Sequence, residues 1–205
     1  PISPGSEWGT PSPIPDHARV MSADRQLGLF LRDNSAQQIH SQSLFMQSGD
    51  ITRVLGVKSR SNNDECIRVI IDAISVSYTD AHGVEHTDVC VGSLSIARRF
   101  LRGAICIVSN SGYWNDHEVA PRAHLNDGKL DIFEVSGAMR WSQRRLMWQK
   151  TSLGTHLPHP LLSYSQGDFS HWEGSPQRLT IDGQFVATVT KVACRIQSDC
   201  VQIYA

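Results

Sequence analysis

The chain has 205 residues, of which 40% are hydrophobic and 19% are charged, and its formal net charge is -1. This length and composition are typical of one globular domain, or one domain with an appendage, that can bury a core. The near-neutral charge excludes a nucleic-acid partner that is held by bulk electrostatics. An anionic partner could be bound only through a local basic patch.

The five cysteines indicate neither a disulfide framework nor a zinc site, because their number is odd and no C-x-x-C spacing occurs. Buried thiols of a cytoplasmic protein are the simplest expectation. No apolar run approaches the roughly 18 residues that a membrane span requires. The first residues also lack the basic and apolar regions of a signal peptide. The sequence therefore favours a cytoplasmic protein, and peripheral contact with a membrane stays open.

The first part of the chain predicts an extended arm and two short helices. Residues 1–15 hold five of the nine prolines, which excludes regular helix and favours an arm on the surface. The helical spacing of apolar residues predicts a helix over 23–33. The stretch S-G-D-I-T-R-V-L-G at 48–56 predicts a second helix, capped by Ser48 or Asp50 and ended by a glycine.

The remainder of the chain is mostly typical of β-strands. Runs rich in β-branched residues predict strands at 67–80, 84–96, 103–112, 129–137 and in the tail from 160. The Asp-Ala-His-Gly turn between the first two predicts a hairpin. Residues 138–153 lack turn residues and predict a further helix. The expected fold is mainly β (α+β), an antiparallel two-layer β-sandwich with a short helical N-terminal portion.

Two Asp-Gly turns stand out within this β-rich part. The segment L-N-D-G-K-L-D at 125–131 places a tight turn directly before a strand, and Gly128 can adopt the positive φ that such a turn requires. The segment T-I-D-G-Q-F at 180–185 contains the second turn. By local pattern alone, each is a loop that joins strands.

Four segments follow one another along the chain: S-G-D-I-T-R-V-L-G at 48–56, the turn at 125–131, S-L-G-T-H at 152–156 and the turn at 180–185. In this order they resemble the C-terminal portion of the diacylglycerol kinase family, soluble lipid kinases that include sphingosine kinases. That family has a segment of the type G-T-x-N-D-F-A-R-x-L-G. A β-rich domain with a D-G-x-L-D motif, a helix, a G-x-H stretch and a D-G-E turn follows it. The resemblance implies this domain over residues 46–205. Residues 1–45, the proline-rich arm and first helix, would be a partial N-terminal portion.

The resemblance also implies site residues. Asp50 and Arg53 occupy binding positions of the first segment, although Met46-Gln47 replace its Gly-Thr and Gly49 replaces its Asn. Asp127 and the backbone carbonyl of Lys129 would help to hold a structural divalent ion, either Mg²⁺ or Ca²⁺.

In the second turn, Asp182 would lie near the phosphoryl-transfer site, but Gln184 stands where the family has Glu. Gln184 can shape a binding site and cannot ionise, so it cannot transfer a proton. The family's G-G-D-G-T nucleotide loop does not occur in the sequence. Such a loop binds phosphates because its backbone N–H groups are unobstructed by side chains, so ATP is not expected here.

Two functions remain open from the sequence. The first is a non-catalytic module that binds a lipid, another ligand or a partner, with Asp182 as a vestigial catalytic position. The second is a divergent lipid kinase whose nucleotide domain is missing or belongs to another chain.

The predicted helix at 138–153 suggests one binding surface. Trp141, Arg145 and Trp148 share a face, and Arg140 and Arg144 flank it. This stripe could bind an anionic lipid or membrane surface. Alternatively, both tryptophans pack on the sheet while the arginines reach solvent. A homodimer through strand edges also stays open, and no nucleic acid is expected as a partner.

Overall fold

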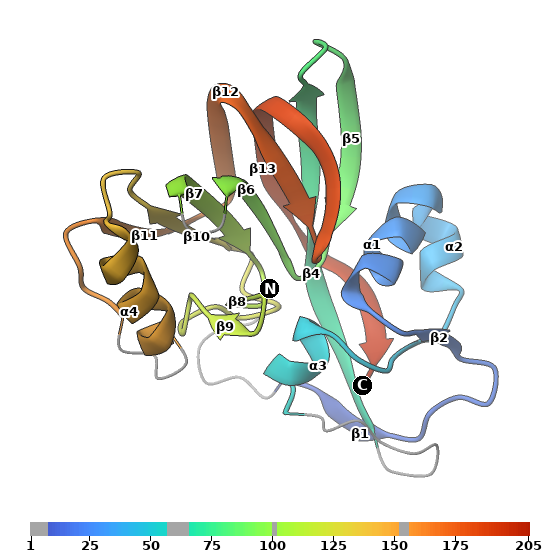
Figure 1. The fold of residues 1–205 in the computed structure, drawn as a ribbon. Helices are drawn as coiled ribbons and strands as arrows, with labels where there is room; N and C mark the ends of the chain where they lie inside the picture. The colour runs from blue at the N-terminus through green and yellow to red at the C-terminus, as the bar shows by residue number, and fades with distance from the viewer. Residues whose placement is uncertain (1–7, 57–65, 100–101, 152–155) are drawn as a thin grey trace.

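The computed structural model describes residues 8–56, 66–99, 102–151 and 156–205 (Figure 1). Strands make up 51% and helices 17% of the structure, which confirms the predicted mainly β fold. Most strands belong to one 11-stranded sheet, and two others form a small separate sheet.

The main path of the large sheet runs in the order β1 (Thr10–Ser12), β4 (Cys66–Asp80), β13 (Gln184–Tyr204), β12 (Phe169–Ile181), β6 (Ser93–Arg99), β7 (Arg102–Ser109), β10 (Leu130–Val135) and β11 (Leu162–Gly167). Three strands join it from the side: β2 (Arg19–Met21), β3 (Leu44–Met46) and β5 (Glu85–Cys90). The small sheet consists of β8 (Tyr113–Trp114) and β9 (His117–Glu118). The helices are α1 (Asp24–Asp33), α2 (Ala36–His40), α3 (Asp50–Val54) and α4 (Trp141–Thr151).

Strand β12 joins the two halves of this sheet. Both of its ends pair with β13, at Phe169–Glu173 and Gln177–Ile181, whereas only Arg178–Ile181 pairs with β6. The register shifts between Glu173 and Gln177, and a bulge of this kind bends a strand and increases its twist. The strands on the β13 side and the strands on the β6 side can therefore turn away from each other at β12, while hydrogen bonding along the sheet remains continuous.

The three helices that the sequence predicts at 23–33, 48–56 and 138–153 are confirmed as α1, α3 and α4. The predicted hairpin is confirmed as β4 and β5, which pair from Thr79 to Ile74. The predicted cap of α3 is wrong: the capping position is Gly49, and no side chain of its own segment caps the helix. The Asp24 carboxylate accepts a hydrogen bond from the Asp50 backbone instead, at 2.6 Å.

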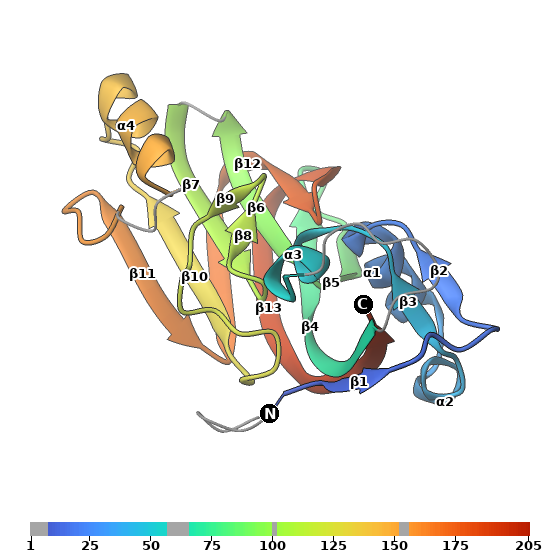
Figure 2. The ribbon, with the colours of Figure 1, turned by 90° about the horizontal axis from the view of Figure 1, so that it is seen from below.

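The N-terminal helices connect two parallel strands. α1 and α2 lie between β2 and β3, which pair in parallel, and β3 pairs in parallel with the end of β13. Arg25 of α1 forms a buried ion pair of 2.7 Å with Asp88 of β5, which fixes the helix against the hairpin. Figure 2 shows α1 and α2 at the end of the sheet opposite α4.

Buried apolar residues form three clusters along the sheet. One lies beneath α1 and α3, one lines the centre of the sheet, and one lies beneath α4. Within the described ranges, no helix is both long and apolar enough to cross a membrane.

Candidate functional site

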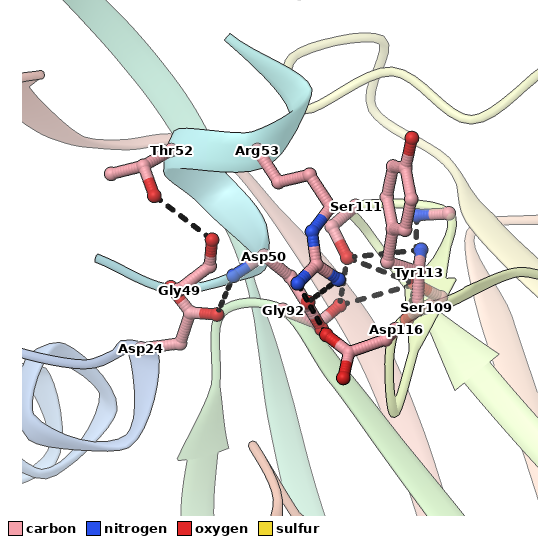
Figure 3. Close-up of polar contacts among 11 residues, drawn as sticks. Asp24, Gly49, Asp50, Thr52, Arg53, Gly92, Ser109, Ser111, Tyr113 and Asp116 are labelled. Atoms are coloured by element: carbon pink, nitrogen blue, oxygen red, sulfur yellow. Dashed lines mark hydrogen bonds and ion pairs between the residues drawn. The ribbon is translucent and has the colours of Figure 1, made fainter. Parts of the chain in front are cut away.

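Three carboxylates lie near one another where the first turns of α1 and α3 approach the sheet, and Figure 3 shows two of them, Asp24 and Asp50. Asp24 begins α1, Asp50 begins α3, and Asp182 lies in the turn between β12 and β13. A Cβ atom on Gly92 would lie 3.2 Å from Asp24 Oδ2 and 3.3 Å from Asp182 Oδ1, so both carboxylates crowd this glycine. Gly49 is equally constrained, since its φ is +130° and a Cβ there would lie 2.2 Å from Asp24 Oδ1.

The Asp182 carboxylate is fully engaged with its own surroundings. It accepts hydrogen bonds from the backbone N–H groups of Val91, Gly92 and Ser93 at 2.9 to 3.2 Å, and from the Cys90 thiol at 3.2 Å. Burial raises the pKa of Asp182, while the Gly92 N–H group acts in the opposite direction. Asp182 therefore anchors the β12–β13 turn to the β5–β6 turn.

Asp24 is a second carboxylate in this cluster whose pKa is raised. Burial, and then the nearby Asp182 charge, raise its pKa from 3.8 to about 7. Its Oδ1 atom is buried and has no hydrogen-bond partner among the described residues. The sequence analysis missed Asp24, and the available signal was an acidic residue at the first position of the predicted helix.

Arg53 is neutralised by two carboxylates. It pairs with Asp50 at 3.2 Å and with Asp116, and its guanidinium lies 5.3 Å from the ring centre of Tyr113. Asp116 occupies the tip of the β8–β9 hairpin, where it and Asn115 both have positive φ, as a tight hairpin turn requires. The structure brings the predicted residues Asp50 and Arg53 together, and the hairpin tip adds a partner that the sequence analysis missed.

Buried hydroxyl groups support the glycine at the centre of the cluster. The Gly92 carbonyl accepts hydrogen bonds from Ser109 Oγ at 3.2 Å, Ser111 Oγ at 3.4 Å and the Asn110 backbone at 2.9 Å (Figure 3). Its N–H group meanwhile points to Asp182. The β5–β6 turn is thus fixed from both sides.

The first Asp-Gly turn is held by a residue that the sequence analysis did not consider. Asp72 of β4, which is completely buried, accepts hydrogen bonds from the Gly128 and Asp199 backbone N–H groups, both at 2.8 Å. Gly128 has the predicted positive φ, at 72°. Asp127 makes only a local contact, accepting from the Lys129 N–H group at 3.0 Å. Asp72, rather than Asp127, therefore ties this turn to the sheet.

A second carboxylate, that of Asp131, lies close enough to Asp127 for their charges to interact. Asp131, at the end of the same motif, is buried and accepts hydrogen bonds from Tyr164 and Gln166 through Oδ1. Its Oδ2 atom has no partner among the described residues. Burial raises the pKa of Asp131, and the Asp127 charge adds to this effect. The described residues contain no group of three His, Cys, Asp or Glu side chains that could hold a metal, so backbone carbonyls and water would have to complete the shell.

We expect a bound divalent ion at Asp127 and Asp131 to stabilise the folded protein. An ion at 100 times its dissociation constant adds about 2.7 kcal/mol to the free energy of unfolding. Millimolar Ca²⁺ or Mg²⁺ should therefore raise the melting temperature, and Asp131→Asn should abolish the increase. Asp16→Asn, which changes an exposed carboxylate, should leave it intact. A wild-type melting temperature that neither ion changes would reduce Asp127 to a turn residue.

The predicted surface on α4 is only partly present. Arg144 is 1% exposed and donates hydrogen bonds to the backbone carbonyls of Met139, Gly103 and Ser136. Trp148 is buried too, with its ring 5.1 Å from that of Trp114.

Both predictions for this helix are therefore wrong in part. Trp148 packs in the core but Trp141 does not, and Arg144 is not available to a surface ligand. Trp141 and Arg145 are exposed, with the Arg145 guanidinium 6.0 Å from the Trp141 ring centre, and Arg140 is exposed beside them. Gln184 is exposed at the start of β13.

No family model and no curated protein matches this sequence. Among solved structures, two structures of a candidate diacylglycerol kinase from Bacillus anthracis str. Sterne are similar, with TM-scores of 0.50 and 0.51. Each is 13% identical in sequence, and the match covers 79% of this chain and 69% of the other. The chain therefore has a diacylglycerol-kinase-like fold, as the sequence resemblance implied.

Proposed function

We propose that this chain is a diacylglycerol-kinase-like module that does not transfer phosphate and instead binds a lipid, another ligand or a partner. The observation that carries the proposal is the state of Asp182. Its carboxylate is committed to backbone N–H groups of residues 91–93, so it is an anchor of the fold and not a free base. Phosphoryl transfer needs a carboxylate that can orient the attacking hydroxyl.

The charge around α1 also opposes nucleotide binding. A helix N-terminus binds phosphate when its N–H groups are accessible and no negative charge competes. The turn from β2 into α1 consists of Ser22 and Ala23, without a glycine, and Asp24 follows directly. Asp50 and Asp182 add negative charge nearby, and Arg53 is already paired. These carboxylates would repel a phosphate group at the start of α1.

We expect the protein to show no saturable heat on titration with Mg-ATP and no phosphate transfer to diacylglycerol in mixed micelles. Calorimetry and a labelled-phosphate assay measure the two quantities separately. A cooperative thermal transition of the same sample establishes that the protein is folded. Saturable binding accompanied by turnover would contradict the proposal.

One observation favours a second candidate, a divergent lipid kinase that works with a nucleotide domain from elsewhere. A carboxyl group with a pKa of about 7, such as Asp24, is suited to accept a proton near neutral pH. If a separately supplied nucleotide domain restores turnover, Asp24→Asn should remove it. Turnover that Asp24→Asn leaves unchanged would exclude Asp24 as the base.

A further inference from the structure

Strand β11 forms an open edge of the large sheet. It ends the main strand path, and among the described strands it pairs with β10 alone. Figure 2 shows it as the outermost strand, beyond β10. Its six residues pair with β10 one to one and without a bulge, so this edge is regular over its whole length. A regular strand edge is a template on which a further strand can pair.

The other described edges of the sheet are short or covered. β1 and β2 have three residues each. β5 is longer, but α1 lies against it, since Arg25 donates a hydrogen bond to the Val89 backbone carbonyl at 3.3 Å and forms an ion pair with Asp88. β5 also carries Glu85 at its start, and charge on an edge strand opposes pairing with another chain.

The sequence of β11, L-S-Y-S-Q-G, lacks the features by which proteins usually protect an edge strand. It contains no charged residue and no proline. Ser163, Ser165 and Gln166 are exposed. A neighbouring strand would therefore meet small or uncharged side chains along this edge.

The ladder between β10 and β11 determines which backbone groups face outward. Ser136 and Leu161 continue its register, and the Ser136 N–H group donates to the Leu161 carbonyl at 2.9 Å. Residues of an antiparallel ladder alternate between hydrogen-bonded and non-hydrogen-bonded positions. Tyr164 and Gln166 lie an odd number of residues after Leu161, so their N–H and C=O groups point away from β10.

We propose that β11 pairs in antiparallel orientation with β11 of a second copy of this chain, so that two large sheets join into one. A two-fold axis perpendicular to the sheet keeps each face of the strand on the same side in both copies. The outward groups of Tyr164 and Gln166 recur in the second copy with the same alternation, so the edge is complementary to itself. No charge on either strand opposes the pairing.

The expected dimer is reversible. A strand edge of six residues is smaller than a standard interface, which buries about 800 Å² per partner. The inference goes beyond the proposed function and does not depend on it. β11 lies at the end of the sheet opposite α1 (Figure 2), so pairing there leaves the cluster around Asp24 unchanged.

The test is sedimentation velocity of the full chain at concentrations from about 1 to 100 µM. We expect the wild type to change reversibly from monomer to dimer. Ser165→Lys and Ser165→Glu each place like charges opposite or diagonal to one another across the axis, so each should raise the dissociation constant at least about tenfold. An equimolar mixture of the two variants should restore the dimer, because the charges are then opposite.

Ser77→Lys is the matched control, because Ser77 is also an exposed strand serine but lies on β4. It should associate as the wild type does. A wild type that stays monomeric throughout, an equal loss in Ser77→Lys, or a mixture that remains monomeric would overturn the proposal. The Mg-ATP titration described above reports on the proposed function separately.

Hydrogen exchange gives a second readout that needs no variant. The N–H groups of Tyr164 and Gln166 become hydrogen-bonded only in the dimer, whereas those of Ser163 and Ser165 face β10 in both states. Exchange at Tyr164 and Gln166 should therefore slow severalfold as the protein concentration rises, and exchange at the two serines should not change. Exchange that is independent of concentration at all four residues would also overturn the proposal.

Discussion

Asp24→Asn should stabilise the protein above pH 7 and remove a large part of the pH dependence of its stability. Burial and the Asp182 charge raise the Asp24 pKa from 3.8 to about 7. Between these two values, the unfolded chain has lost the proton that the folded chain keeps. Stability therefore falls as pH rises through this range, by up to about 1.4 kcal/mol per pH unit, and levels off above the folded pKa.

Asparagine has no proton to lose, so the variant should lack this decline. Above pH 7 its free energy of unfolding should exceed that of the wild type by up to about 4 kcal/mol. Urea unfolding at a series of pH values from 4 to 9 measures the difference. Asp33→Asn on the same helix is the control, because Asp33 is exposed and Arg32 lowers its pKa. Parallel pH profiles for wild type and Asp24→Asn would show that Asp24 is ionised throughout.

Asp72→Ala should destabilise the protein by about 2 to 4 kcal/mol, because it leaves two partly buried backbone N–H groups without their acceptor. These groups belong to Gly128 and Asp199, which lie far apart in sequence and are both held by the Asp72 carboxylate. Asp72→Asn should have an intermediate effect, since an amide oxygen can accept one of the two bonds. The free energy of unfolding in urea is the quantity to compare.

Asp127→Ala is the matched comparison for this turn. Asp127 accepts only the Lys129 N–H group, in a partly exposed position, so its loss should cost less than about 1 kcal/mol without added metal. Equal destabilisation by both alanine variants would mean that the turn is held by its own side chain. The structure predicts a clear difference instead.

The longer elements of this fold could be predicted from the sequence, and the shortest could not. α1 and α4 have enough residues to show a helical pattern, and the hairpin of β4 and β5 has a recognisable turn. β2 and β3 have three residues each, too few for any period, and their parallel pairing depends on the end of β13. β13 itself resembles several short strands in sequence, because polar residues interrupt its apolar runs, and its register also shifts relative to β12 and β4.

The candidate site could likewise be predicted only in part from the sequence. The two Asp-Gly turns could be located, because positive φ at Gly128 and Gly183 follows from local chemistry. The acidic cluster could not, because Asp24 and Asp182 are brought together only by the packing of α1 against the sheet.

The sequence also did not show which side of α4 faces the core. An arginine at a core position, Arg144, is stable there only because carbonyls of distant residues accept its hydrogen bonds. Sequence pattern alone would place such a residue in solvent.

The parallel pairing of β3 with β13 has a consequence for protein synthesis. Leu44 pairs with Ile203, so β3 leaves the ribosome long before its partner strand exists. At translation rates of 5 to 20 residues per second, the delay is roughly 10 to 30 s. During that time Leu44 and Met46, which are buried in the finished protein, can pair with β2 but lack their contacts with β13. The N-terminal part of the sheet therefore cannot be completed until the chain has been synthesised as far as β13, and faster elongation shortens the time for which these apolar residues are incompletely covered.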